Sequence, residues 1–596
     1  MNFAQWFRQR RGYDLMPYLP LMVGIPIENC ETTERVLRDV RATIAELTDT
    51  VFYPTLKAEA RRHGCLLSAE SIAPTMTSDG MLHYRHADYP MGEFWLNSPT
   101  HDKPNDMLDA VSGGHIYGKQ VIQAEGFTEL RGNFGETPAQ LKPLLDRQYC
   151  LGINRLFFHV FAHNPDPDLR PGMTLDGIGL FFQGTQPWWP EGRSMVDYIC
   201  RCQRLLQRGR PVIDVAVYTG SETPRRAILP SRLAPLTGYH YDSYNNDAIL
   251  RPTASPFRPQ YRVLFLPEAR PMDPDRQPMP DSVKSALSRL DMTVIDGNPT
   301  VGQLQSLGIE PDAVLPADVC FAHRSTDSCE IYFISNQSGH ARDLDIRLRD
   351  HKGRAAYVYD AVTATCRAAA HRQGAMHLQL PAYGSRFVLF GACAETADAL
   401  TLPAGENTMA TDNTMATDAR EATANADAKE ATAPADTLVT ALSPKGKIHL
   451  TFQSNRLEMD IDSIGFDWST SGNDSVRYYS GRVLYSFDFE YKTAPATAYL
   501  LRLADLHDVA TIVLNGQDCG SVWTAPYEAN ITRALRDGHN HIEIQVANTW
   551  SNAIDGHDLG RDPFGGIWTN AKYRKASKAL LPAGILGGLQ IIGVAQ

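Results

Sequence analysis

The sequence has no uninterrupted apolar run of ~18 residues, so it contains no obvious membrane-spanning helix. Its start also lacks the features of a signal peptide. Residues 1–11 (MNFAQWFRQRR) include neither an apolar core segment nor a small-residue cleavage site. As written, the chain is therefore expected to stay in the cytoplasm and to have no membrane span.

Several catalytic signatures are also missing. There is no G-x-S-x-G, no P-loop, no H-E-x-x-H and no C-x-x-C. The ten cysteines have no metal-ligand spacing, and the pair Cys200 and Cys202 lies in an amphipathic helix where packing is the expected role. Nothing in their distribution demands disulfides. A net charge of −11 argues against nucleic acid or an anionic membrane surface as the main partner.

What the sequence does contain is enough apolar material for several domains. Hydrophobic residues make up 43 % of the 596 residues and aromatic residues 9 %. At about 100–200 residues per domain, this length predicts three to five domains. In residues 1–211, helical and strand-like segments alternate, which is typical of a parallel sheet. The expected helices are 32–63, 105–118, 138–150 and 195–207, and the expected strands are 65–70, 91–95, 121–125 and 155–163.

Only about four strands can be counted in residues 1–211, whereas a closed (β/α) barrel needs eight. The region is therefore either an open sheet or the carboxyl-terminal half of a barrel whose first half is missing. The abrupt helical start favours the second interpretation, and we expect residues 1–211 to be a partial barrel that carries the chemistry.

Four further regions follow. Residues 212–318 carry strands at 212–218, 261–267 and 292–296 with a helix at 281–290, and predict a small doubly wound, flavodoxin-like α/β domain. Residues 319–394 alternate like a small β-sandwich. Residues 395–440 repeat the hexamer NTMATD, lack aromatics and are expected to be a disordered linker. Residues 441–596 predict a jelly-roll-like, galactose-binding-like β-sandwich, with an Asn515-Gly516 hairpin turn.

The first region places acids at strand ends. Glu125 ends the strand 121–125 and is followed at once by Gly126, and a carboxylate at the carboxyl end of a buried strand is where a barrel places its chemistry. Glu70 and Glu93 occupy comparable positions. Glycoside hydrolysis requires two carboxyl groups beside the scissile bond. The sequence therefore offers Glu125 and Glu93 as catalytic candidates.

Other side chains of this region suit sugar binding. His159 and His163 are expected on one face of the strand 155–163, and indole rings can stack on sugars. The predicted substrate-binding residues are Glu70, Trp95, His159, His163 and Trp188. Each has a structural alternative. Glu125 could be a surface-loop glutamate, the histidines hydrogen-bonded core residues, Trp188 a barrel plug and Glu70 the partner of an arginine.

Short motifs across the chain are similar to those of glycoside hydrolase family 106, the α-L-rhamnosidases. The more specific ones lie in the first region: 10–14 (RRGYD), 17–20 (PYLP), 92–95 (GEFW), 123–127 (QAEGF), 158–163 (FHVFAH) and 171–173 (PGM). Terminal motifs such as 513–516 (VLNG), 520–523 (GSVW) and 581–587 (LPAGILG) are shared with β-galactosidase-like and β-mannosidase-like enzymes. The resemblance covers nearly the whole chain except residues 395–440.

This resemblance implies an inverting glycosidase that acts on the terminal α-L-rhamnose of a polysaccharide or glycoside. It carries Glu125 over as the base that activates water and Glu93 as an active-site acid or ligand. It also implies a calcium ion at the sugar site and an amino-terminal region, with a partner carboxylate, that this chain lacks. Periplasmic or secreted location follows if the chain is a fragment of an exported enzyme. Two rivals stay open: a catalytically inert carbohydrate-binding protein and a β-galactosidase-like glycosidase. Metal ligands and oligomeric state are not predicted.

Overall fold

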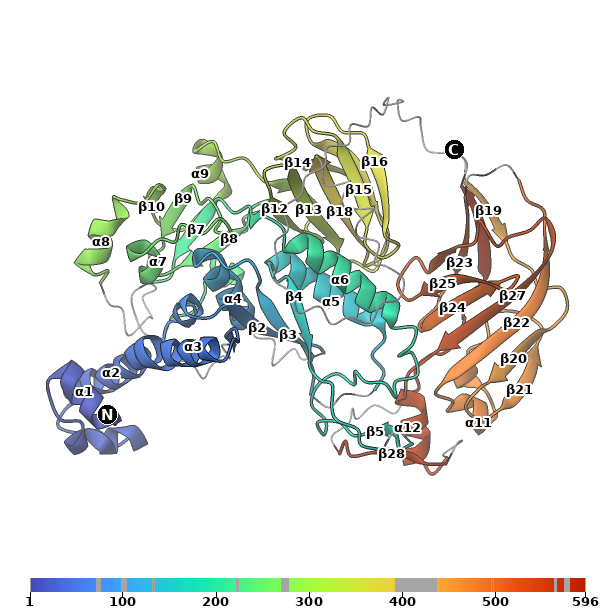
Figure 1. Cartoon of the computed structure of the whole chain (residues 1–596), viewed down its shortest axis with the longest axis horizontal. Helices are drawn as coiled ribbons and strands as arrows, with labels where there is room; N and C mark the ends of the chain where they lie inside the picture. Colours follow the sequence, from blue (N-terminus) through green and yellow to red (C-terminus); the bar gives the residue numbers. More distant parts are fainter. Residues whose placement is uncertain are drawn as a thin grey trace.

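A computed structural model describes most of the chain (Figure 1). The described residues are 2–70, 77–97, 104–130, 132, 134–166, 168–220, 225–268, 278–391, 437–494, 496, 498–561, 565–572 and 579–594. None of the helices in these ranges combines the length and the hydropathy needed to cross a bilayer.

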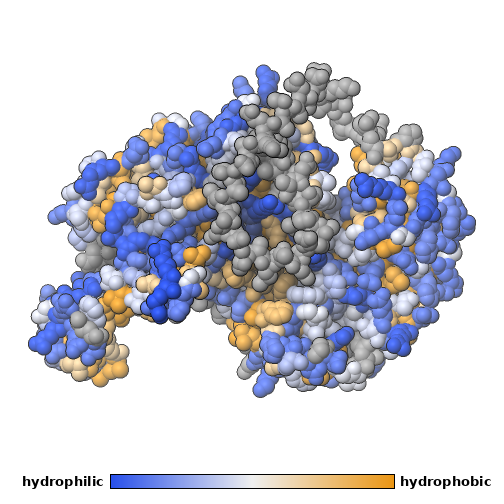
Figure 2. All heavy atoms as spheres, in the orientation of Figure 1, coloured by the Kyte–Doolittle hydropathy of each residue, from blue (hydrophilic) through white to orange (hydrophobic). Residues whose placement is uncertain are grey.

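The N-terminal helices form an arm that projects from the rest of the molecule (Figure 1). Helix α1 (Phe3–Arg11) begins with a capping box between Asn2 and Gln5 and packs against α2 (Cys30–Leu47), burying Phe7 and Val36. A π-helical turn (Thr48–Phe52) connects α2 to α3 (Tyr53–Arg62) without a break, so the expected helix 32–63 is confirmed. Figure 2 shows apolar patches on this arm.

The next unit contains a four-stranded, all-parallel sheet in the order β1-β2-β3-β4. Its strands are β1 (Ser68–Glu70), β2 (Tyr89–Trp95), β3 (Gln123–Thr128) and β4 (Arg155–Phe158). Helix α4 (Pro104–Ile116) joins β2 to β3, and α5 (Pro138–Leu151) joins β3 to β4. Helix α4 comes so close to β2 that a Cβ on Gly92 would lie 2.8 Å from the Asp106 carbonyl oxygen. One face of the sheet is therefore covered by helix, while alternate residues point to the other face.

The strand expected over residues 155–163 is shorter than predicted. Strand β4 ends at Phe158 because the chain then pairs with a different partner: Val160 N–H donates to the Leu180 carbonyl, and Leu180 N–H to the His159 carbonyl. His159 and His163 consequently do not share one face of a strand, and that expectation was wrong.

Helix α6 (Arg193–Leu206) leads into a second parallel sheet, in the order β10-β9-β7-β8. Strands β7 (Val215–Tyr218), β9 (Val263–Leu266) and β10 (Thr293–Asp296) lie within the expected segments, whereas β8 (Tyr241–Tyr244) was not anticipated. Short helices α7 (Asn246–Leu250), α8 (Asp281–Leu287) and α9 (Val301–Ser306) accompany it.

Two antiparallel sheets follow and form the small sandwich. One has the order β16-β15-β18-β13-β12-β6 and the other β11-β14-β17. Cys329 in β13 is disulfide-bonded, which the cysteine spacing did not indicate. The strands are β6 (Arg210–Pro211), β11 (Ala313–Val314), β12 (Val319–Ser325), β13 (Cys329–Asn336), β14 (Arg342–Leu348), β15 (Ala356–Asp360), β16 (Thr365–Ala369), β17 (Ala375–Leu380) and β18 (Ser385–Gly391).

The C-terminal sandwich pairs the sheet β21-β20-β22-β27-β24-β25 with the sheet β19-β29-β23-β26. The predicted hairpin turn joins β24 to β25, with Asn515 and Gly516 both at positive φ. Most of the expected linker lies outside the described residues, but β19 (Thr437–Ala441) occupies its last positions, so the linker was extended too far. The other strands are β20 (Ile448–Phe452), β21 (Leu457–Ile461), β22 (Arg482–Tyr491), β23 (Ala498–Leu503), β24 (Val509–Leu514), β25 (Gln517–Val522), β26 (Glu528–Asn530), β27 (Gly538–Ala547) and β29 (Leu589–Val594).

A buried ion pair joins the first unit to the small sandwich. Lys142 Nζ on α5 donates to Asp146 Oδ2 at 2.6 Å, and the side chains of both residues are buried. The same ammonium group reaches Ser385 Oγ on β18 at 2.9 Å, while Tyr198 on α6 donates to the other Asp146 oxygen. All polar groups of this set are therefore satisfied across two helices and a strand.

A second buried network lies inside the small sandwich. The ring nitrogens of His323 face Asp312 (3.0 Å) and Glu330 (3.2 Å). These hydrogen-bonded carboxylates outweigh the effect of burial and raise the pKa of His323 to about 9, while the pKa values of Asp312 and Glu330 are lowered. Arg349 and Lys352 face the two acids, Asp350 lies beside His323, and the Tyr332 hydroxyl donates to Asp312.

We expect replacement of His323 by phenylalanine to reduce the free energy of unfolding by about 3–5 kcal/mol at pH 7, because it removes the fully buried cation that donates to both acids and leaves them only the partly exposed Arg349 and Lys352. The raised His323 pKa contributes stability that is complete below pH ~6.5 and is lost as the pH rises through about 9. The lowered acid pKa values contribute stability that is lost on acidification. Chemical denaturation from pH 4 to 10 should therefore show the largest difference from the parent between about pH 5 and 6.5, and this difference should decrease from there to about pH 9.

The matched control is His377→Phe, since His377 also faces two aspartates but is solvent-exposed. Its effect should stay within about 0.5 kcal/mol at every pH. Equal effects of the two substitutions would show that burial of the His323 network does not increase its contribution to the free energy of unfolding.

Candidate active site

Three acids share one face of the parallel sheet. Glu93 on β2 and Glu125 on β3 are register partners, and Glu70 on β1 pairs with Met91, two residues before Glu93. Because paired residues of adjacent strands point the same way, all three side chains lie on the face opposite to α4. We call this the carboxylate face. Glu93 is only 5 % exposed, whereas Glu125 is partly open to solvent.

Glu125 accepts a hydrogen bond from Thr128, the last residue of β3. A bulge at Phe94/Trp95 makes Trp95 pair with Thr128 rather than with Phe127, which has a positive φ of 66°. Thr128 Oγ1 donates to Glu125 Oε1 at 2.5 Å. Bulges commonly re-aim side chains beside active sites, and here the bulge accompanies the contact that fixes the carboxylate.

His159 approaches the same oxygen from the neighbouring strand. Its backbone N–H donates to the Gly126 carbonyl, and its Nδ1 lies 3.7 Å from Glu125 Oε1. The predicted neighbourhood of Glu125, Glu93 and His159 is thus present. Glu93 is the fifth of the seven residues of β2, and His159 is the first residue after β4. Strand β3 begins later than expected and continues to Thr128, so Glu125 lies within the strand rather than at its end.

Two further residues of this site were missed in the sequence. Phe157 pairs with Glu125 across β3 and β4, and its ring is 46 % exposed on the carboxylate face. Glu129 follows β3 as a buried carboxylate that accepts a hydrogen bond from Asn97 Nδ2 at 3.1 Å. The available signals were an aromatic residue two positions before His159 and a second acid four positions after Glu125.

The remaining predicted residues are placed less favourably for substrate. Trp188 is fully buried, packs near Phe182 and donates its indole N–H to the Glu136 carbonyl, so it is a core residue. The alternative that it plugs the fold is therefore closer to the structure. His163 is exposed in the loop beyond β4, away from the sheet register. Trp95 ends β2 beyond the bulge and is partly buried.

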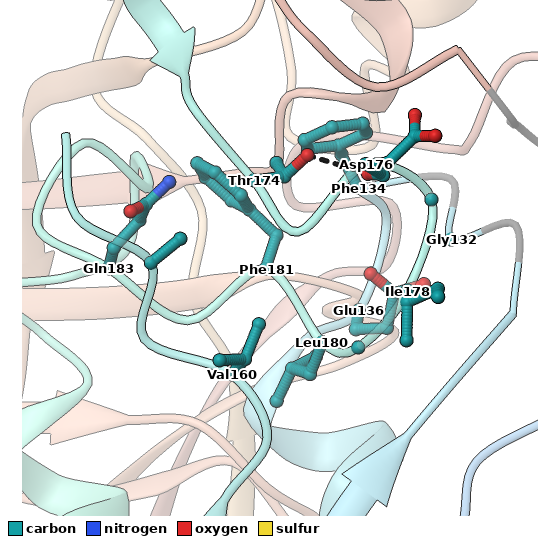
Figure 3. A pocket seen from close by; sticks show the side chains of 13 residues that line it. Gly132, Phe134, Glu136, Val160, Thr174, Asp176, Ile178, Leu180, Phe181 and Gln183 are labelled. Carbon is teal, nitrogen blue, oxygen red and sulfur yellow. Dashed lines mark hydrogen bonds between the residues drawn. The ribbon is translucent and has the colours of Figure 1, made fainter.

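An apolar hollow lies next to the loop that follows β4. It has about 360 Å³ of empty space and is lined mainly by Phe134, Phe181, Val160 and Leu180. Figure 3 shows these side chains, with the Thr174 hydroxyl hydrogen-bonded to the Asp176 carbonyl at 2.6 Å at its edge. Such a lining suits apolar contact rather than acid–base chemistry.

The acids of the carboxylate face do not by themselves form a metal site. Among the described residues, one group of three acidic or histidine side chains brings its ligand atoms within 4.8 Å of one another: Asp312, His323 and Asp350. Both ring nitrogens of His323 face carboxylates there, so a protonated ring serves as the donor instead of a metal ligand. Glu70, Glu93 and Glu125 form no such group. Calcium stays a prediction, and no chemical step is derived through it.

Two family models match parts of this chain. Residues 1–276 match the family model described as alpha-L-rhamnosidase, and residues 428–578 match the galactose-binding domain-like model of glycosyl hydrolase family 2. The structure is similar to that of a rhamnosidase from Novosphingobium sp. PP1Y, with a TM-score of 0.80 and 25 % identity, covering 99 % of this chain and 59 % of that one.

A curated relative from Formosa agariphila, named "Putative beta-glucuronidase", is 31 % identical over 390 residues, which is 58 % of this chain and 33 % of the relative. The chain thus spans about a third of that protein and under two thirds of the rhamnosidase. Residues 1–276 thus match the family model of the α-L-rhamnosidases, a glycoside hydrolase family.

Proposed function

We propose that the protein is a glycoside hydrolase that removes terminal α-L-rhamnose, with the carboxylate face as its active site. The observation that carries this proposal is the in-register pair Glu93 and Glu125, within the residues that match the family model. A solvent-accessible carboxylate on the open face of a parallel sheet suits a general base for glycosidic bond cleavage, and a second carboxyl group beside it suits contact with the sugar.

We further propose that the four-stranded sheet is the carboxyl-terminal half of a (β/α) barrel. The parallel order, the helix against one face and the acids on the other support this view. In this proposal residues 1–211 are the catalytic unit, 212–318 a flavodoxin-like domain, 319–394 a small sandwich and 441–596 a galactose-binding-like sandwich.

Glu125 is proposed as the general base. As a carboxylate it accepts a proton from water, the water oxygen attacks the anomeric carbon, and a carboxylic acid protonates the leaving oxygen. The hydrogen bond from Thr128 holds the carboxylate, and the exposed Phe157 ring offers an apolar surface to the sugar. Attack from the face opposite to the leaving group inverts the anomeric configuration.

Glu93 suits substrate contact better than the role of the acid in an inverting pair. Adjacent strands lie about 4.8 Å apart, whereas acid and base of inverting enzymes are separated by about 6.5–9.5 Å. Because Glu93 and Glu125 are direct register partners on adjacent strands, we expect the distance between their carboxyl groups to be close to the inter-strand distance. We therefore propose that Glu93 binds the sugar, and that the acid is either Glu129 or a carboxyl group outside this chain.

A panel of aryl glycosides tests the proposed activity. We expect the purified chain to release nitrophenol from 4-nitrophenyl α-L-rhamnoside and not from the β-D-galactoside or β-D-glucuronide, because the first unit matches a rhamnosidase family. Cleavage of either β-glycoside without the rhamnoside would reassign the sugar. Absence of turnover on all three, with cooperative unfolding intact, would favour a carbohydrate-binding protein over an enzyme.

A further inference from the structure

A second cavity separates the segment after β4 from the C-terminal sandwich. Residues 161–164 and 183–187 form one wall, and residues 453–454, 481–482 and Trp550 form the other. Its cavity volume is about 800 Å³. Pockets for small ligands are commonly about 300–1,000 Å³, so the cleft lies toward the upper end of that range and has room for more than one sugar ring.

The cleft begins next to the carboxylate face. His159 lies beside Glu125, and Phe161 and His163, two and four residues further along the same segment, line the cleft. Ala162 and Gln183 line both the cleft and the apolar hollow. Only a few residues separate the surroundings of Glu125 from the cleft, so a long ligand bound at Glu125 extends into the cleft.

Two buried carboxamides in the cleft wall lack a hydrogen-bond donor. Gln183 and Gln186 are 3 % and 2 % exposed. Their Nε2 groups donate to the carbonyls of Met173 (2.7 Å) and Phe181 (3.4 Å), but Oε1 of each accepts no hydrogen bond from the described part of the chain. Both oxygens are almost inaccessible to solvent, and buried acceptors are normally satisfied, so a hydroxyl group that enters the wall beside Gln183 or Gln186 would complete them.

The other side chains that line the cleft also suit a sugar ligand. The Phe161 ring is 64 % exposed and lies 6.5 Å from the Trp189 ring, which offers a surface for the apolar face of a sugar. The guanidinium groups of Arg170 and Arg482 supply donors for ring and hydroxyl oxygens.

Hydrogen bonds between the walls fix the cleft in place. Trp550 Nε1 donates to the Thr185 carbonyl at 2.8 Å, and Arg482 Nε donates to the Pro187 carbonyl at 3.3 Å. Because the walls are already joined, binding does not have to order them, which favours affinity.

We propose that this cleft binds several sugars on the leaving-group side of the scissile bond, so that the substrate is a rhamnose-terminated oligosaccharide rather than a small rhamnoside. The proposal rests on the function proposed above. Sugar hydroxyls donate to Gln183 and Gln186, and one sugar ring stacks on Phe161.

Calorimetric titration of the full chain tests the cleft, with Glu125→Gln present throughout to prevent turnover. The probes are methyl α-L-rhamnoside, a rhamnose-capped galactotriose and the uncapped galactotriose. We expect the capped probe to bind about tenfold more tightly than the methyl glycoside, and Phe161→Ala or Gln186→Leu to weaken binding of the uncapped probe by about tenfold.

The matched control is Phe52→Ala, because Phe52 is 56 % exposed and lies in the π-helical turn between α2 and α3, outside the residues that line the cleft. Equal affinity of the capped probe and the methyl glycoside, or equal effects of Phe161→Ala and Phe52→Ala, would overturn the proposal. Thermal melting shows whether the Gln186→Leu variant is folded. If it is not, the binding measurement on Phe161→Ala decides, because Phe161 is exposed and its replacement does not disturb the core. If rhamnosides neither bind nor react while binding of galactotriose depends on Phe161, the proposed rhamnosidase activity is wrong, but sugar binding in the cleft is supported.

Discussion

Replacement of Glu125 by glutamine is expected to lower kcat on 4-nitrophenyl α-L-rhamnoside by about 10²–10⁴-fold, the usual contribution of a general base. Glutamine keeps the size of the side chain and can still accept the hydrogen bond from Thr128, so the fold of β3 should persist. Initial rates at saturating substrate measure kcat, and circular dichroism checks folding.

The leaving group distinguishes a base from an acid at this position. A 2,4-dinitrophenolate departs without protonation, so loss of the acid spares the dinitrophenyl glycoside, whereas loss of the base slows both substrates equally. We expect equal losses for Glu125→Gln. Glu59→Gln is the matched control, because Glu59 is an exposed residue on α3 that pairs only with the exposed Arg62 among described contacts. Near-parental turnover of Glu125→Gln would remove Glu125 from the mechanism.

Sequence reasoning located the strands of the first unit because their apolar segments end in glycine or acidic residues, and Glu125 was identified for that reason. It did not reveal that Glu93 is the register partner of Glu125, since register is decided by which strands pair and by the bulge at Phe94/Trp95. The adjacency of these acids, which now argues against Glu93 as an inverting acid, is a property of tertiary structure.

The errors have local physical causes. The apolar run after Arg155 looked like a long strand, but pairing with Leu180 ends β4 at Phe158 and leaves His163 in an exposed loop. Trp188 looked like a sugar platform because indoles often are, yet its N–H has a backbone acceptor within the core. Composition cannot distinguish a buried tryptophan from an exposed one. Glu129 was overlooked because it lies outside the strand that drew attention to Glu125.

A second large effect is expected from Lys142→Met, which should reduce the free energy of unfolding by about 3–5 kcal/mol. Methionine fills the space of the aliphatic stem but leaves Asp146 buried without its cation, and it removes the donors to Ser385 and to the Tyr383 carbonyl. Urea denaturation followed by tryptophan fluorescence measures the change. Arg193 on α6 is exposed and pairs with the partly exposed Asp197, so Arg193→Met provides the control and is expected to change stability by less than about 0.5 kcal/mol.

The double variant Lys142→Met with Asp146→Leu separates charge from packing. Removing one partner of a buried pair leaves an uncompensated charge, whereas removing both leaves none. Tyr198 then loses its acceptor on Asp146 but keeps Ser385 Oγ within 2.9 Å. We therefore expect the double variant to be more stable than Lys142→Met alone. If the two losses simply add, the buried charge is not the cause, and the link between α5 and β18 depends on packing.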